Sequence, residues 1–187
     1  MAGREFHDGA TDGLEALEPL DPEKIHSFSE LLEAMRKTAF GGRRLGEAYE
    51  TLAAMIEDSD CKVVLTLSGA MTIAKMGKII STMIDRGMVQ AIISTGALVA
   101  HGLSESVGKL HYRHDASHSD EELFQKGYNR VYDTLEMESN LNYVEHVVSL
   151  TLKRINTEQP LSSHLLTREL GKTLAEEFEG PGILKSA

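Results

Sequence analysis

Two turns built from small residues are the first places in this 187-residue chain where ligand chemistry is expected. The apolar stretch Lys62 to Leu67 ends at Ser68-Gly69-Ala70, and the apolar stretch Val89 to Ser94 ends at Thr95-Gly96-Ala97. Small side chains let backbone N–H groups approach a ligand, and the start of a following helix favours anionic groups. The same residues also suit tight turns, and the G-x-G-x-x-G dinucleotide fingerprint is absent, so both interpretations stay open.

The histidines are the second source of candidate chemistry. His101 comes just after the second turn, where it could act as a general acid or base, hydrogen-bond an amine, or be solvated. A second group lies further along the chain, in the expected loop from Lys109 to Ser119: His111, His114 and His118, with Asp115 and Asp120 nearby. Its spacing fits no standard metal motif, so no metal site is predicted.

The elements that position these residues read as strand, helix, strand, helix. Lys62–Leu67 and Val89–Ser94 are short, apolar and rich in β-branched residues, which is typical of buried strands. Met71–Arg86 carries apolar residues at helical spacing and meets a C-cap glycine at Gly87, and Leu98–Val107 is helical again. A crossover helix makes the strands parallel, with both turns at the carboxyl edge of the sheet, where such sheets bind ligands.

The rest of the chain is predicted to be helical and to add no strand. The predicted helices are Ser27–Lys37, Leu45–Ile56 (after a break at Gly41 and Gly42), Asp120–Tyr128, Asn140–Ile155 and a last one opened by Pro160 and Ser162. A two-stranded parallel sheet cannot cover its own faces. We therefore expect an α/β fold, a parallel sheet with flanking helices, that a C-terminal half or a partner chain completes. Residues 1–20 are expected to form a flexible arm and residues 21–187 one portion of a domain.

The composition of the chain argues against several classes of binding partner. The net charge is −10, which argues against binding to nucleic acid or to anionic membranes. Cys61 is the single cysteine, so no intrachain disulfide can form. Neither a signal peptide nor an apolar stretch long enough to span a membrane is recognisable, and a cytoplasmic location is expected.

Several segments together resemble a known family. They are "LSGAMTIAKMGKIISTMIDRGMVQAIISTGALVAHGL", "DEELFQKGYNRVYDTL", "AFGGRRLGEA" and "LLTRELGKTLAEE". From about Asp21 to Ala187 the chain is similar to the deoxyhypusine synthase family, most closely to its prokaryotic deoxyhypusine synthase-like branch. The resemblance implies a Rossmann-like core, tetramers made of tight dimers, and NAD-dependent oxidation of spermidine. It also implies transfer of an aminobutyl group, through an imine on a lysine, to an acceptor amine.

The resemblance also implies roles for individual positions. The loops that touch NAD in the family match the first turn and the second turn, and an adjoining pair that contacts polyamine and cofactor matches Ala100 and His101. Val131 resembles a position that lines the polyamine tunnel. Eukaryotic members have Asn at the position of Gly69, and the carboxylate expected at Ala100 is missing, which weakens the case for spermidine. The positions so implied for cofactor are Ser68, Gly69, Ala70, Met71, Thr72, Thr95, Gly96, Ala97 and His101.

The catalytic lysine of the family lies in the C-terminal half, and no lysine in this chain matches it. The resemblance therefore implies a transferase that needs a C-terminal half or second polypeptide, in a homo- or hetero-tetramer, for activity. Two alternatives remain open. One is a catalytically inactive binding or regulatory subunit, or a fragment. The other is a homospermidine synthase-type enzyme whose acceptor is a small diamine, rather than a lysine of the hypusine-bearing translation factor.

Overall fold

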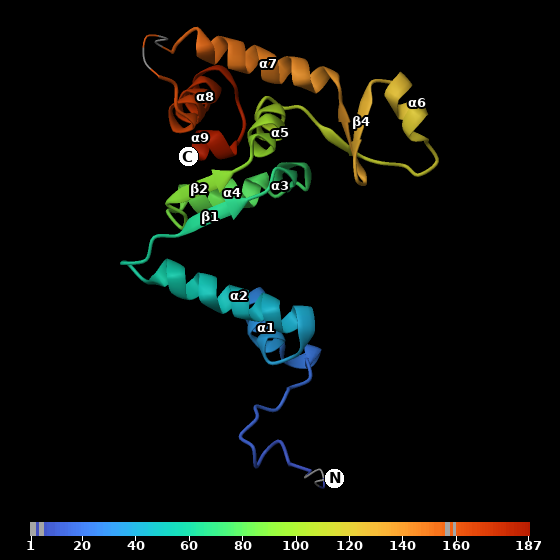
Figure 1. Ribbon diagram of the computed structural model, residues 1–187, viewed down its shortest axis with the longest axis vertical. Helices are drawn as coiled ribbons and strands as arrows, with labels where there is room; N and C mark the ends of the chain where they lie inside the picture. The colour runs from blue at the N-terminus through green and yellow to red at the C-terminus, as the bar shows by residue number, and fades with distance from the viewer. Residues whose placement is uncertain (1–2, 4–5, 156–157, 159) are drawn as a thin grey trace. The chain divides into compact units, whose positions relative to one another are not determined.

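A computed structural model of the protein describes residues 3, 6–155, 158 and 160–187 (Figure 1). The chain divides into two compact units, Met1–Cys61 and Lys62–Ala187. Residues 1–2 and 4–5 of the predicted N-terminal arm lie outside the described part of the chain. In the described part of residues 1–20 there are turns but no helix or strand. No helix among the described residues combines the length and the apolar character that crossing a membrane requires.

The first unit is a pair of packed helices. The elements are η1 (Pro22–Lys24), α1 (Phe28–Arg36) and α2 (Phe40–Glu57). The helix predicted over Ser27–Lys37 is confirmed, and the Ser27 hydroxyl caps it by accepting a hydrogen bond from the Glu30 N–H. The predicted break at Gly41 and Gly42 is wrong, because both glycines lie in the first turn of α2. A glycine costs a helix only about 1 kcal/mol, which the packing of α2 on α1 overrides.

The second unit contains the predicted parallel pair. Strands β1 (Val64–Leu67) and β2 (Ala91–Ser94) run parallel, as the sequence predicts, and the structure places Val64 opposite Ala91. Helix α4 (Gly77–Asp85) connects them, and α5 (Gly96–Ser106) follows β2. One face of the sheet packs on these helices through an apolar core whose members include Ile80, Leu98, Ile183, Leu65, Leu67 and Ile92.

The single helix predicted over Met71–Arg86 is wrong, because it is interrupted. A short helix α3 (Ala70–Ile73) precedes α4, and between them Lys75 takes a left-handed conformation with φ of 63°. The break brings the Lys75 ammonium to within 3.0 Å of Glu105 Oε1. The predicted cap at Gly87 is confirmed by its φ of 69°, a conformation that suits glycine.

A second sheet includes part of the predicted histidine-rich loop. Strands β3 (His111–Arg113), β4 (Tyr128–Val131) and β5 (Thr134–Met137) form an antiparallel sheet in the order β3-β5-β4. The prediction that two strands carry all of the sheet structure is therefore wrong. Helix α6 (Asp120–Gln125) is shorter than predicted. It starts at a capping box in which the Ser119 side chain and the Glu122 side chain each bond the other residue's backbone N–H.

Three helices complete the second unit: α7 (Ser139–Leu152), α8 (Ser163–Glu177) and α9 (Ile183–Ser186). Figure 1 shows α7 and α8 on one side of α5, with α9 beside α8. A second apolar core joins α5, α7 and α8 and is centred on Leu103, Val147, Leu170 and Leu174. The last two predicted helices are thus confirmed, and both pack against α5 through this core.

Candidate functional site

The two small-residue turns meet. Gly69, after β1, lies so close to Ala97, after β2, that a Cβ atom at position 69 would overlap the Ala97 Cβ. The same added atom would lie 3.0 Å from the Ala97 carbonyl carbon and 3.0 Å from the Leu98 nitrogen. The Ser94 hydroxyl ties the strand ends further by donating to the Leu67 carbonyl oxygen at 2.9 Å. The prediction that both turns share one edge of the sheet agrees with this contact.

The residues of the turns divide into exposed and buried groups. Those open to solvent are Ser68, Ala70, Thr95, Gly96 and Ala97. Gly69 and Thr72 are buried, and the Thr72 hydroxyl donates to the Gly69 carbonyl oxygen at 3.2 Å. Met71 is half-buried against the apolar core beneath the sheet. The exposed group forms the surface that a ligand can reach, and the buried group fixes the shape of the first turn.

The start of α5 offers backbone donors. Thr95 is the N-cap residue, and its side chain makes no capping hydrogen bond. The first N–H groups of a helix have no partner within the helix, so an unfilled cap leaves donors for an anion. Nothing lies within 4 Å of the place where a Gly96 Cβ would be, so there is open space beside this backbone. A phosphate-bearing cofactor fits these features.

Three side chains from three elements converge beside the middle of α5. His101 Nδ1 lies 2.9 Å from Glu136 Oε2, and His111 Nε2 lies 3.5 Å from Glu136 Oε1. His111 on β3 and Glu136 on β5 are directly opposite each other in the antiparallel ladder. The His111 side chain is 1% exposed and the Glu136 side chain 4%, whereas that of His101 is 21% exposed. A carboxylate is therefore buried between two imidazoles.

Lys75 touches this group from outside. Its ammonium lies 2.9 Å from His111 Nδ1 as well as 3.0 Å from Glu105 Oε1. Burial lowers the pKa of His111 below its ordinary value of 6.5, and the positive charge of Lys75 lowers that pKa further. The carboxylates of Glu136 and Glu105 act in the opposite direction without reversing the shift. His111 is therefore neutral at pH 7.

The other predicted positions lie near this region or apart from it. Ala100 is half-buried on α5, next to His101. Val131 on β4 is 37% exposed and pairs with Thr134 on β5, the strand that carries Glu136. His114 and His118 do not join the buried group; His118 lies in the loop after β3, and the His118 carbonyl oxygen is 3.4 Å from His114 Nε2. The three histidines that sequence spacing grouped together are thus split.

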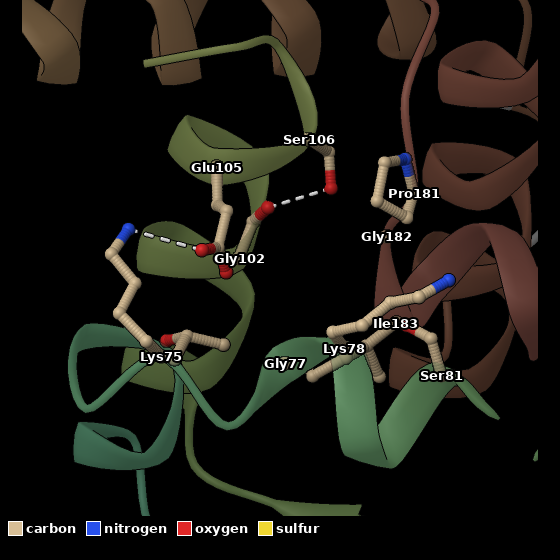
Figure 2. Close-up of a pocket in the computed structure, with 11 residues that line it drawn as sticks. Lys75, Gly77, Lys78, Ser81, Gly102, Glu105, Ser106, Pro181, Gly182 and Ile183 are labelled. Carbon is tan, nitrogen blue, oxygen red and sulfur yellow. Dashed lines mark hydrogen bonds and ion pairs between the residues drawn. The ribbon is translucent and has the colours of Figure 1, made fainter. Parts of the chain in front are cut away.

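A pocket lies on another side of α5 (Figure 2). It has a volume of about 110 Å³ and lies between the start of α4, α5 and residues 181–183. Figure 2 shows the Lys75–Glu105 ion pair on one side of it and the bond from the Ser106 hydroxyl to the Gly102 carbonyl on the other. Of the predicted cofactor positions it includes only Thr72. The pocket is therefore distinct from the strand-end surface.

Sequence reasoning missed Glu136 and misplaced His111. Both were assigned to segments without strands, so their pairing could not be expected. The available signal was the stretch "YNRVYDTLEM", in which two short runs flank Tyr132-Asp133. Tyr132 has a φ of 57°, which makes the tight connection between β4 and β5.

With this geometry in place, comparison with known proteins identifies the family. The family model described as deoxyhypusine synthase matches residues 30–187, which is most of the chain. The chain belongs to the deoxyhypusine synthase family. A solved structure of a presumed deoxyhypusine synthase from Entamoeba histolytica supports the fold, with a TM-score of 0.58 and 14% identity. That match covers 91% of this chain and 60% of the other.

Curated relatives within the deoxyhypusine synthase family are more similar in sequence. A probable deoxyhypusine synthase 2 from Methanosarcina acetivorans is 36% identical over 163 residues, which cover 85% of this chain and 47% of that protein. A deoxyhypusine synthase-like protein from Elusimicrobium minutum is 30% identical, over 89% of this chain and 44% of its own length. The chain thus spans about half the length of the curated relatives that it matches.

Proposed function

We propose that this chain is the N-terminal half of an NAD-dependent aminobutyltransferase and supplies its first two cofactor loops. The observation that supports this proposal most strongly is the contact between the turns after β1 and β2, where Gly69 meets Ala97. It gathers two loops from separate strands at the carboxyl edge of a parallel sheet, where α/β proteins bind nucleotides. Family membership makes NAD the cofactor to test.

The exposed residues suit particular parts of the cofactor. The uncapped start of α5 can bind a pyrophosphate through the Gly96 and Ala97 N–H groups. The hydroxyls of Ser68 and Thr95 are exposed beside it and can donate or accept hydrogen bonds. When bound, NAD would accept a hydride from the amine substrate. In this proposal the chain's residues bind and orient the cofactor, while the nucleophilic lysine comes from the C-terminal half.

The sheet supports a second half as partner. Val64 on β1 is 49% exposed and Ile93 on β2 is 63% exposed, while the opposite face of both strands is packed on helices. Burying apolar surface stabilises a protein by about 25 cal/mol per Å², so large side chains in the middle of a strand are normally covered. A C-terminal half or second polypeptide that packs on this face would cover them. Assembly into a homo- or hetero-tetramer in the cytoplasm completes the proposal.

The acceptor can be a small diamine, as in homospermidine synthesis. The favouring observation is at the substrate positions: Ala100 has no carboxylate to attract a cationic amine, and His101 next to it faces Glu136 at 2.9 Å. A polyamine with several charges is bound most strongly where carboxylates are near. Turnover of spermidine with putrescine, set against spermidine with the hypusine-bearing translation factor, distinguishes the two acceptors.

The test is NAD binding and NADH formation by the chain alone and together with a C-terminal half. We expect spermidine-dependent NADH only from the assembled pair. Gly96→Glu places a carboxylate in the open space at the start of α5 and should lower NAD affinity at least about tenfold through repulsion. Gly41→Glu is the matched control, because Gly41 is also exposed, in the first turn of a helix, with nothing within 4 Å of its added Cβ.

Two results would contradict the proposal. One is an unchanged NAD affinity in Gly96→Glu, because the start of α5 would then not contact the cofactor. The other is an assembled protein that never forms NADH with any polyamine. In that case the catalytically inactive binding or regulatory subunit becomes the better description.

A further inference from the structure

We propose that His101, His111 and Glu136 bind one divalent transition-metal ion, for which zinc fits best. These three residues offer one ligand atom each, and the three atoms all lie within 4.8 Å of one another. Two imidazole nitrogens and one carboxylate oxygen form a ligand set that zinc uses, with a fourth position left for water. Nitrogen ligands also disfavour Mg²⁺ and Ca²⁺, which prefer oxygen. The site shares His101 with the proposed substrate positions, but metal binding does not depend on aminobutyl transfer.

The spacing of the ligand atoms suits a tetrahedral ion. Zinc lies about 2.0–2.1 Å from imidazole nitrogen and from carboxylate oxygen, so two of its tetrahedral ligands are about 3.3 Å apart. The observed separations are 2.9 Å from His101 Nδ1 to Glu136 Oε2 and 3.5 Å from His111 Nε2 to Glu136 Oε1. These two distances end on different oxygens of the same carboxylate, and the three ligand atoms all lie within 4.8 Å of one another, so side-chain rotation has to bring them closer around one ion.

Unmade hydrogen bonds are the second line of support. His101 Nδ1, His111 Nε2 and Glu136 Oε1 are all buried and have no hydrogen-bond partner. The two short separations therefore lack hydrogen-bond geometry, although the atoms are close. A buried polar atom without a partner is unfavourable, and a single ion would satisfy all three atoms at once. Its positive charge would also balance the buried carboxylate.

The strands and the helix make the site rigid. His111 and Glu136 are held opposite each other by the β3–β5 ladder, and His101 projects from α5, which the second apolar core anchors. Sites built on regular elements hold ligand geometry better than sites on loops.

The contact of Lys75 with His111 is expected to weaken metal binding, and this effect on the affinity can be measured. A lysine ammonium only donates, so its contact at 2.9 Å makes His111 Nδ1 an acceptor and places the ring proton on Nε2. Metal binding requires Nε2 without a proton, so the proton must leave or move to Nδ1, and Lys75 must withdraw. The Lys75 side chain is 46% exposed and already paired with Glu105, so it can keep the Glu105 ion pair when it moves away from His111. Removing its charge should therefore tighten metal binding.

The experiment is a titration of the untagged, chelator-treated chain with Co²⁺ and Zn²⁺, followed by calorimetry and by the visible spectrum of bound Co²⁺. We expect one ion per chain, a tetrahedral Co²⁺ spectrum and no heat with Mg²⁺. Glu136→Gln and His111→Asn should lower the affinity more than about 100-fold, since even outer-shell changes cost 10–100-fold. His114→Asn with His118→Asn is the matched control, expected to leave the affinity unchanged.

Three outcomes would overturn the proposal. They are no saturable binding by the unaltered chain, wild-type affinity in Glu136→Gln, or an equal loss in the His114 and His118 control, which would indicate a surface site. Circular dichroism establishes that each variant is folded. Should Glu136→Gln and His111→Asn both unfold, Lys75→Met leaves all three ligands in place and gives the deciding result. An affinity about tenfold higher for Co²⁺ supports the site, and an unchanged or lower affinity contradicts it.

Discussion

The contact between the turns after β1 and β2 predicts that Gly69→Ala destabilises the second unit. Gly69 has φ of −64° and ψ of −24°, which alanine adopts readily, so the backbone change alone would stabilise the protein by about 0.4–1 kcal/mol. The added methyl group instead overlaps Ala97 Cβ and lies 3.0 Å from two backbone atoms that cannot rotate away. Overpacking of this kind costs about 1–3 kcal/mol. The net expectation is a loss of about 1–2 kcal/mol.

Thermal unfolding followed by far-ultraviolet circular dichroism measures this loss, because the chain contains no tryptophan. A protein of this size loses about 2–4 °C of Tm per kcal/mol, so Gly69→Ala should melt about 2–8 °C lower. Gly96→Ala is the control at the facing turn: its new methyl group meets nothing within 4 Å and should leave the Tm unchanged or raise it.

A double-mutant cycle with Ala97→Gly tests the cause. Removing the Ala97 methyl group relieves the overlap but leaves the two backbone contacts of the Gly69→Ala methyl, so the double variant should recover part of the loss. Residues in contact typically couple by 0.5–3 kcal/mol. A Gly69→Ala variant as stable as the Gly96→Ala control, or a cycle with no coupling, would refute the statement that the two turns touch.

Three further predictions follow from the packing and the pKa of His111. The pKa of His111 is lowered in the folded chain, so the free energy of unfolding should fall as the pH drops from about 6.5 toward the folded pKa. Urea titrations at several pH values measure this slope, and His111→Asn should flatten it. Gly46→Ala should destabilise the first unit by about 1–3 kcal/mol, because its Cβ would press on the α1 backbone; a urea midpoint equal to the wild type would contradict this. Thr151 donates a hydrogen bond to Thr173 in the buried α7–α8 interface, so Thr151→Val should lower the free energy of unfolding by about 0.5–1.5 kcal/mol. The double variant with Thr173→Val should lose less than the sum of the two single losses.

The parallel pair could be predicted because its signals are local. Apolar β-branched runs, a helical period between them and Gly87 at the helix end each depend on a few adjacent residues. The interruption at Lys75 could not be predicted, because it depends on the distant Glu105 and His111. An isolated helix would continue through a lysine. Here the ion pair and the contact with His111 accompany a left-handed residue that local propensity disfavours.

The antiparallel sheet escaped prediction for a related reason. Strand β5 buries Leu135 and Glu136 side by side, so its pattern does not alternate between apolar and polar residues. The buried position of Glu136 makes sense only beside two histidines, one on another strand and one on a helix. The turns after β1 and β2 were found as candidates from sequence, whereas the group of His101, His111 and Glu136 exists only once the fold brings three distant segments together.

The two-stranded sheet has a consequence for how the protein must be produced. In a sheet of the order β1-β2 each strand is an outer strand, with one row of backbone N–H and C=O groups facing away from its neighbour. Outer strands with exposed side chains such as Val64 and Ile93 pair readily with strands of other molecules and lead to aggregation. The chain synthesised alone is therefore expected to be prone to aggregation. If a C-terminal half completes this sheet as proposed, co-synthesis with that half should raise the soluble yield.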